Sequence, residues 1–203
     1  MRLPIIEDYI DNKDQPKRKD KPNIIVVHHS GNDVPFKNEL NYQRGHEYVN
    51  YQYLVSPDGT IYKMCDDEYI TYHAGISNWG KQGQQYDSYG KVKLTGLNPF
   101  SIGVCIQSGG EKFTSKQKAS AFNLLVSLSL KHDISPEYII RHADITQTNG
   151  RSYSKELAPS RSDSVIKRSC RKWDVGVNFW KRSNWSWKGY QNRIGKEVAK
   201  YRR

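Results

Sequence analysis

Histidines at the ends of two predicted strands are the residues best placed in this chain to do chemistry. His28 and His29 close the run over residues 23–30, where four β-branched residues in a row predict a strand buried on both faces. His142 closes a second, shorter apolar run over residues 138–142. Because open α/β sheets bind ligands at the carboxyl ends of their strands, His28 and His142 could meet at one sheet edge.

Two imidazoles at one edge suit a catalytic zinc site, which takes three protein ligands and leaves one position open for water. Such a metal ionises its bound water near neutral pH and polarises a carbonyl group. A carboxylate or thiolate from a following loop would have to supply the third ligand. The residues alone leave a second interpretation open, in which the histidines are structural and unrelated.

The segments around these strands predict an α/β fold. The turn at residues 56–59 predicts a hairpin. Helices are expected over about 38–48 and, behind a capping box of Thr114 and Gln117, up to Asp133. Further strands are expected over residues 49–55, 60–64, 69–73 and 101–107. We therefore expect a single α/β domain with a mixed central β-sheet flanked by helices.

The two ends of the chain differ from its middle. Residues 1–22 are interpreted as an N-terminal arm and a charged, solvated linker, and residues 23–180 as the main domain. Residues 181–203 form a basic, aromatic C-terminal extension that ends in a predicted amphipathic helix, which we expect to dock on the domain. Its apolar stripe consists of Tyr190, Ile194, Val198 and Tyr201.

Charge and composition limit the kinds of partner and the compartment that we expect for this protein. The net charge of +11 predicts attraction to polyanions such as nucleic acid, anionic lipid or an anionic wall polymer. The cysteines Cys65, Cys105 and Cys170 are odd in number and far apart, which argues against a disulfide framework. Since no apolar run is long enough for a signal peptide or a membrane span, we expect a protein made in the cytoplasm.

Six short segments follow one another in order across residues 23–180. They carry a His-His-Ser strand end, a Tyr strand with an Asp-Gly hairpin, His-Ala-Gly-x-Ser-x-Trp, Leu-Asn with Ser-Ile-Gly, Arg-His-Ala-Asp, and Arg-Lys-x-Asp. In this order they resemble the zinc-dependent N-acetylmuramoyl-L-alanine amidase superfamily of amidase-type phage lysozymes, AmpD-like amidases and peptidoglycan recognition proteins. The segments are residues 25–30, 49–62, 73–80, 97–104, 141–145 and 171–179.

By position, this resemblance implies that His28, His142 and Asp174 are zinc ligands. It implies that Tyr51 and Lys172 are catalytic groups. Tyr51 would donate a hydrogen bond to bound water or the oxyanion, and Lys172 would stabilise the oxyanion or pass protons. The resemblance also assigns four residues to substrate binding: His29, His73, Asn98 and Trp79. For His29, His73 and Asn98, a structural role stays open as well.

The implied activity is hydrolysis of the bond between N-acetylmuramic acid and L-alanine of the peptidoglycan stem peptide. A phage or prophage endolysin, acting on the cell wall after release, fits the absence of a signal peptide. The basic surface could then contact an anionic wall polymer, and nucleic acid is not the expected partner. Two alternatives stay open: a non-catalytic muropeptide-binding protein and a host cytoplasmic recycling amidase.

The sequence departs from the family pattern in three places. Val175 replaces the proline after the third ligand, and the long gap before that ligand makes residues 146–170 an insertion. A competing alignment at shorter spacing puts Ala158 at the ligand position, which would give a receptor without metal. We favour Asp174, because a lysine, a glycine and a phenylalanine also fall in place around it. Cys105 replaces a glutamate of AmpD-like sequences, as in the phage lysozymes.

Overall fold

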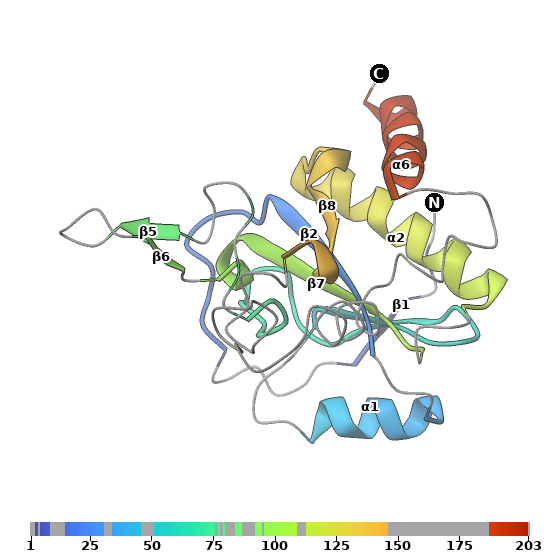
Figure 1. Ribbon diagram of the computed structural model, residues 1–203. Coiled ribbons are helices and arrows are strands. Elements are labelled where there is room, and N and C mark those ends of the chain that lie inside the picture. The colour runs from blue at the N-terminus through green and yellow to red at the C-terminus, as the bar shows by residue number, and fades with distance from the viewer. Residues whose placement is uncertain are drawn as a thin grey trace, which may run out of the picture.

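A six-stranded mixed sheet lies between helices in the computed structural model (Figure 1). The strand order is β1-β4-β3-β7-β2-β8, and all neighbours are parallel except β3 and β4. The predicted single α/β domain with a mixed central sheet is therefore confirmed. The structure describes residues 3, 5–8, 15–30, 34–45, 51–75, 77, 79, 84–86, 92–94, 96–108, 113–145 and 187–202.

The strands of the main sheet have three residues each, except for β2 and β7, which have six. They are β1 (Ile5–Glu7), β2 (Ile24–His29), β3 (Tyr53–Val55), β4 (Ile61–Lys63), β7 (Ser101–Ile106) and β8 (Ile139–Arg141). A separate hairpin of β5 (Gln84–Tyr86) and β6 (Val92–Leu94) projects from the body (Figure 1). The predicted hairpin at residues 56–59 is confirmed by the antiparallel pairing of β3 with β4.

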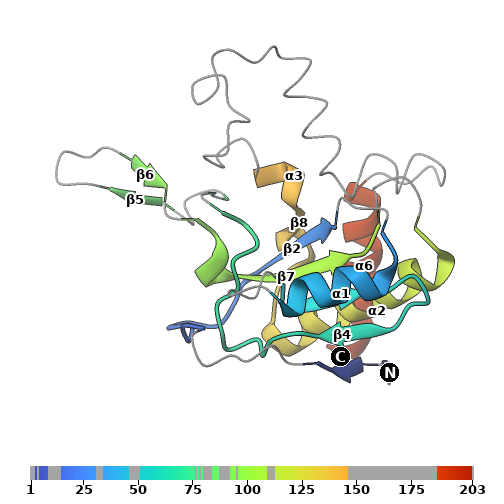
Figure 2. The ribbon, with the colours of Figure 1, turned by 90° about the horizontal axis from the view of Figure 1, so that it is seen from below.

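Helices cover both faces of the sheet, with α2 and α6 on one side and α1 on the other (Figure 1). Short 3₁₀ turns precede β7 and β8, and α3 starts where β8 ends (Figure 2). The helices are α1 (Phe36–Arg44), α2 (Ser115–His132), α3 (His142–Ile145) and α6 (Trp187–Tyr201), and the 3₁₀ turns are Asn98–Phe100 and Pro136–Tyr138.

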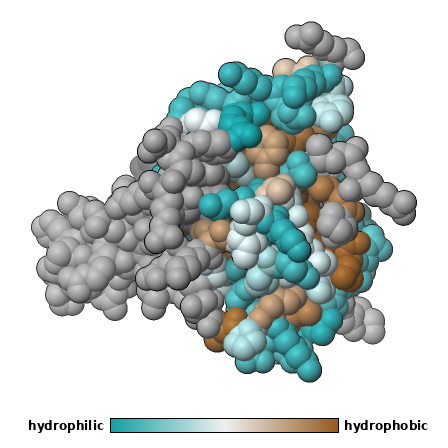
Figure 3. Space-filling model, turned by 90° about the vertical axis from the view of Figure 1, so that its right-hand side faces the viewer, coloured by the Kyte–Doolittle hydropathy of each residue, from teal (hydrophilic) through white to brown (hydrophobic). Residues whose placement is uncertain are grey.

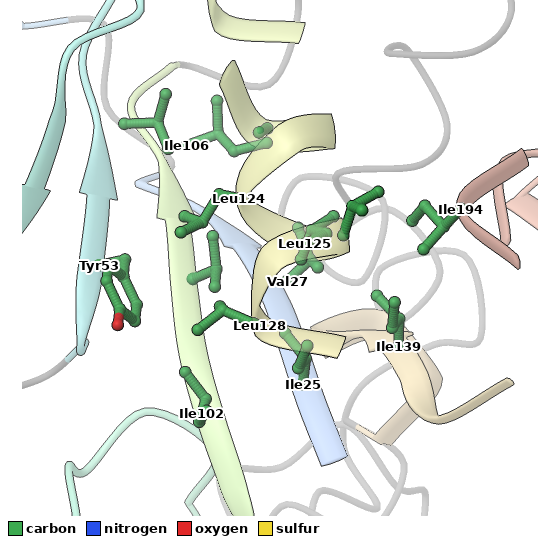
Figure 4. Close-up of a cluster of buried hydrophobic side chains, with 14 of the residues drawn as sticks. Ile25, Val27, Tyr53, Ile102, Ile106, Leu124, Leu125, Leu128, Ile139 and Ile194 are labelled. Carbon is green, nitrogen blue, oxygen red and sulfur yellow. The ribbon is translucent and has the colours of Figure 1, made fainter. Parts of the chain in front are cut away.

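Alternate residues of β2 and β7 point to opposite faces. One set packs under α2 and forms the main core, which we call the core face (Figure 4). The core face comprises Ile25, Val27, Ile102, Val104 and Ile106, covered by Leu124, Leu125 and Leu128. The other set, the site face, comprises Ile24, Val26, His28, Ser101, Gly103 and Cys105.

The predicted capping box starts α2 as expected. Thr114 Oγ1 accepts a hydrogen bond from Gln117 N, and Gln117 Oε1 accepts one from Thr114 N, both at 3.0 Å. Asp133 ends the helix in the left-handed conformation, with φ of 57°. These contacts satisfy backbone groups that the first turn leaves without helical partners.

The predicted C-terminal helix is present as α6 and docks on the domain. Tyr190, Ile194 and Val198 are buried, whereas Tyr201 is 54% exposed and falls outside the buried stripe. Trp187 Nε1 donates a hydrogen bond of 3.1 Å to the carbonyl oxygen of Ile139 on β8. An apolar stripe and an indole thus hold α6 against α2 and the sheet edge.

Two predicted elements differ from the structure. Residues 69–73 form no strand; Tyr69 makes an isolated bridge to Lys17, and the chain then bends. The helix expected to reach residue 48 ends at Arg44 and is capped by Gly45, whereas residues 46–50 lie outside the described ranges. The strand prediction is wrong because only Tyr69 pairs with another segment before the chain bends at residues 72–74.

Arg18 shows that the predicted solvated linker is packed at its described end. Its guanidinium donates to four backbone carbonyls: to Asp67 at 2.7 Å, Asn98 at 2.8 Å, Pro99 at 3.0 Å and Ser101 at 2.7 Å. Burial lowers the pKa of Arg18 to about 10, although Asp67 raises it. The side chain therefore ties the N-terminal segment to the loops ahead of β7.

The described surface is mainly polar. Figure 3 shows hydrophilic residues over much of one face with apolar patches between them, and the mean hydropathy is −0.84. Among the described helices, none has the length and apolar character needed to cross a membrane. The proposed domain boundaries at residues 22 and 180 stay predictions.

Candidate functional site

Three imidazoles and a phenol converge beside the carboxyl end of β2. The ring centroid of His28 lies 4.7 Å from that of His142, 5.1 Å from that of His73 and 5.1 Å from that of Tyr51. His142 follows β8, which pairs in parallel with β2, so both strands deliver their histidines to the same edge. The structure thus brings together four residues that are scattered along the sequence.

The site face of β7 makes room for these rings because its residues are small. Gly103 pairs with Val26 and Cys105 pairs with His28 in the parallel ladder. A Cβ atom on Gly103 would lie 2.7 Å from Cγ of His73, a separation that real Cβ atoms do not show. The ring of His73 therefore occupies the space that a side chain at residue 103 would fill.

His73 makes hydrogen bonds on both sides of its ring. Its Nδ1 lies 3.0 Å from Nε2 of His28, and its Nε2 lies 3.2 Å from Oγ of Ser101. Ser101 Oγ also donates to the carbonyl oxygen of Leu97 at 2.7 Å. These contacts join the imidazole of His28 to the 3₁₀ turn ahead of β7.

Asn98 and Trp79, both predicted to bind substrate, contact the protein around this loop. Asn98 Oδ1 accepts a hydrogen bond of 2.8 Å from the backbone N–H of Ala74, next to His73. Trp79 is partly buried and packs on the apolar cluster below the site, which includes Val26. Their described contacts position the His73 loop, and their predicted role in binding stays a prediction.

Tyr51 lies between His28 and the α1 side of the sheet. It packs partly buried against the apolar cluster that contains Leu40 and Cys105. Burial raises its pKa well above the ordinary value, and the nearby Cys105 and Glu39 raise it further. The phenol therefore keeps its proton at physiological pH and can donate a hydrogen bond.

Gln52, which the sequence analysis missed, locks the neighbouring backbone. Its side chain is fully buried; Oε1 accepts from Gly103 N at 2.7 Å and from Thr71 Oγ1 at 2.8 Å. Its Nε2 donates to the carbonyl oxygen of Tyr69 at 3.1 Å. A buried amide with these partners fixes Tyr51 and Gly103 relative to each other. Its place directly after Tyr51 in a predicted strand gave no sign of these distant partners.

Burial lowers the pKa of all three site histidines. The pKa of His28 falls well below its ordinary value, that of His73 falls to about 3 with a contribution from Arg18, and that of His142 falls to about 4. Neutral imidazoles carry a free nitrogen lone pair, which is the form that binds metal ions. The site is therefore a set of neutral nitrogen donors at neutral pH.

The donor set fits a metal ion, with one ligand still to be supplied. Nε2 of His142 is buried and has no hydrogen-bond partner among the described residues, which costs about 1–3 kcal/mol unless something satisfies it. Within the described ranges, however, no three His, Cys, Asp or Glu side chains are grouped to hold a metal. Asp174 and Lys172 lie outside the described residues, as does Ala158.

His29 does not join the cluster in the strand geometry. By alternation it shares the orientation of Ile25 and Val27 on the core face, and it is 2% exposed. Its Nδ1 lies 3.4 Å from the carbonyl oxygen of Ser108. These observations agree with the structural role that the sequence left open for it.

Comparison with solved structures gives the same fold in an endolysin, a hydrolase and one further catalytic domain. A mutant endolysin from Bacillus subtilis matches with a TM-score of 0.55 at 19% identity, covering 96% of this chain and 100% of that one. The hydrolase AmiA from Staphylococcus aureus, solved in complex with its ligand, matches with a TM-score of 0.59 at 16% identity, covering 98% and 85%. The catalytic domain of XlyA matches with a TM-score of 0.53 at 21% identity, covering 82% and 98%.

Comparison by sequence gives one family. The family described as N-acetylmuramoyl-L-alanine amidase matches residues 18–155. No curated protein matches the chain. The matched range contains all four converging rings and ends ahead of Lys172 and Asp174.

Proposed function

Since the chain belongs to the N-acetylmuramoyl-L-alanine amidase family, we propose that it hydrolyses the amide between N-acetylmuramic acid and L-alanine in peptidoglycan. The observation that carries this proposal is the meeting of neutral His28 and His142 with protonated Tyr51 at one sheet edge. Nitrogen donors beside a hydrogen-bond donor are the parts that a metal-assisted amide hydrolysis needs.

We propose that His28, His142 and Asp174 hold a zinc ion. Two neutral histidines and one carboxylate are an ordinary ligand set for catalytic zinc. Zinc bound there would polarise the substrate carbonyl and make water a nucleophile at neutral pH. Asp174 rather than Ala158 fills the third place in this proposal, because a methyl group cannot coordinate a metal.

Tyr51 and Lys172 would stabilise the negative charge that develops on the carbonyl oxygen and help to protonate the leaving amine. Tyr51 keeps its proton, so it can donate a hydrogen bond to the carbonyl oxygen as negative charge develops there. Lys172 would add a positive charge beside that oxygen or pass a proton to the leaving amine of L-alanine. A preorganised donor of this kind is worth about 3–4 kcal/mol of transition-state stabilisation.

We propose further that the protein is an endolysin acting on intact cell wall. The net charge of +11 favours binding to an anionic wall, and the fold resembles that of an endolysin from Bacillus subtilis. Trp79 and Asn98, beside the His73 loop, would be near the bound muropeptide.

The test is loss of turbidity of purified sacculi by wild type, Asp174→Ala and Glu156→Ala, each with and without a chelator. We expect wild type and Glu156→Ala to clear the suspension and to lose this activity with chelator. Asp174→Ala should be inactive and contain less zinc by elemental analysis. Glu156 is the matched control, because it is a carboxylate beside Ala158 in the competing alignment.

Three results would contradict parts of the proposal. An Asp174→Ala protein that keeps zinc and activity would exclude Asp174 as a ligand. A wild-type protein that binds muropeptides but holds no zinc and cleaves nothing would be a receptor. Faster cleavage of soluble anhydro-muropeptides than of sacculi would indicate a recycling amidase.

A further inference from the structure

The hydrogen-bond chain that leads away from His28 determines where its proton sits. The chain has three links: Nε2 of His28 to Nδ1 of His73 at 3.0 Å, Nε2 of His73 to Oγ of Ser101 at 3.2 Å, and Oγ of Ser101 to the carbonyl oxygen of Leu97 at 2.7 Å. All three side chains are buried, so water does not compete for these links.

The last link fixes the direction of the others. A backbone carbonyl only accepts, so the single hydroxyl proton of Ser101 points to Leu97 O. Ser101 Oγ can then only accept from His73, which places the proton of the neutral His73 ring on Nε2. Nδ1 of His73 is left as an acceptor, and Nε2 of His28 must donate to it.

His28 therefore has its proton on the nitrogen that faces His73. In the neutral ring, Nδ1 then carries the lone pair, and the hydrogen bond to His73 leaves Nδ1 unused. We propose that His73 is a positioning residue, which fixes this tautomer of His28 and so makes Nδ1 its metal-binding atom. The metal half of this assignment rests on the zinc site of the proposed function; the tautomer half does not.

The packing around His73 is built to keep this ring in place. Gly103 leaves the space for the ring, since a Cβ there would meet its Cγ at 2.7 Å and its Cδ2 at 2.9 Å. The amide of Asn98 holds the backbone of Ala74 directly after it. Groups that orient a metal-binding imidazole through its second nitrogen usually contribute about 10–100-fold to metal affinity.

Three variants separate this role from mere packing. His73→Leu fills the site but cannot accept a hydrogen bond from His28. His73→Gln can accept with its amide oxygen and donate to Ser101 with its amide nitrogen, so it should rescue the function of the ring. Tyr72→Leu is the matched control, because its side chain is adjacent in sequence and 45% exposed.

The first measurement uses zinc-free protein and needs no activity. Two-bond ¹H–¹⁵N correlation of ¹⁵N-histidine-labelled wild type should show His28 protonated at Nε2 and unprotonated at Nδ1. His73→Gln and Tyr72→Leu should keep this pattern. In His73→Leu, and in Ser101→Ala to a smaller degree, the two tautomers of His28 should mix. A wild-type His28 protonated at Nδ1 would overturn the proposal.

The second measurement is zinc affinity by competition with a chromophoric chelator. We expect His73→Leu to bind zinc about 10–100-fold more weakly than wild type, and His73→Gln to recover most of the loss. Equal affinities of the Leu and Gln variants would overturn the positioning role. A wild type that binds no zinc but shows the expected tautomer would contradict the proposed zinc site and leave the role of His73 toward His28 standing.

Discussion

The core face and the site face are two surfaces of the same two strands, and on β7 they are built from opposite kinds of residue. On β7, the core face carries Ile102, Val104 and Ile106, whereas the intervening positions are Ser101, Gly103 and Cys105 on the site face. Large aliphatic side chains gain free energy from the apolar area they bury. Small residues bury little themselves but let other side chains approach the strand.

This difference shows where stability and chemistry come from in the sheet. The core face is covered by α2 and consists of contacts that any well-packed aliphatic set would make. The site face is covered by His73 and Tyr51, whose positions depend on individual partners such as Gln52 and Ser101. We expect substitutions on the core face to change stability and those on the site face to change activity.

The largest effect should follow from His142→Ala on the site face. Amidase activity should fall by more than about 100-fold, because losing even an outer partner of a metal ligand costs about 10–100-fold. The unfolding temperature should change little, since the buried Nε2 of His142 makes no hydrogen bond to the part of the chain that the structure describes. Sacculus clearing and thermal unfolding measure the two quantities. The control is His132→Ala, at a histidine away from the site, which should lower the unfolding temperature and leave the activity near wild type. Equal losses of activity in the two variants would contradict the expected difference between the two faces.

Leu124→Ala on the core face should mainly lower stability. Leu124 of α2 is 1% exposed and packs against the core face of the sheet. Truncating such a side chain lowers the free energy of unfolding by about 2–5 kcal/mol. We expect the unfolding temperature to fall by roughly 5–15 °C, as measured by circular dichroism. Activity per folded molecule should stay near wild type below the transition, and a specific loss there would show that the two faces are coupled.

Gly103→Ala should lower both stability and activity, because the new methyl group would collide with the ring of His73. Overpacking of this kind costs about 1–3 kcal/mol. Activity should fall with it, since His73 must move away from His28. Gly195→Ala in α6 is the matched control: its Cβ would lie 3.3 Å from Pro136 Cγ, and the gain in helix propensity offsets the contact. Similar denaturation curves and activities for both variants would contradict the close fit at Gly103.

The smallest expected effect is a change in the pH dependence of stability, and it concerns Asp67 at the edge of the core face. Asp67 accepts hydrogen bonds from Tyr53, Lys131 and His132 at 2.7–2.8 Å. Burial raises the pKa of Asp67, but these partners more than offset it, so the pKa lies well below its ordinary value. The carboxylate therefore stabilises the fold above its unfolded pKa of about 4, and this contribution is lost as the pH falls toward the folded pKa.

Thermal unfolding of wild type and Asp67→Asn from neutral pH down to about pH 3 tests this dependence. The Asn variant should be less stable at neutral pH and should lose less stability on acidification. Parallel curves for the two proteins would show that Asp67 is not the group responsible. Activity at neutral pH should be similar in both proteins because Asp67 lies on the core side of the sheet.

Local pattern was enough to predict the elements that depend on neighbours in sequence. The β-branched run of β2, the capping box at Thr114 and the turn at residues 56–59 all act within a few residues, and each is confirmed. The convergence of His28 and His142 also followed from position, because parallel strands end at one edge.

Contacts between distant segments were not predictable in this way. Gln52 bonds Gly103 across 51 residues, and Arg18 bonds carbonyls that lie 49–83 residues away. No local pattern indicates these partners, because the position of a buried amide or guanidinium depends on acceptors and donors that are distant in sequence. The strand prediction for residues 69–73 is also wrong, because contacts with distant segments determine the backbone there. All three zinc ligands stay predictions, and Asp174 also lies outside the described residues.

Arg18 has a consequence for where the folding unit begins. A shortened protein starting at Asn23 would leave four carbonyl oxygens, one at Asp67 and three within residues 98–101, without the guanidinium that binds them. Two of those oxygens belong to Asn98 and Ser101, which hold the His73 loop and ring. The amino-terminal charged segment thus holds together the loops around the His73 ring, and engineers who shorten or graft this domain should keep it.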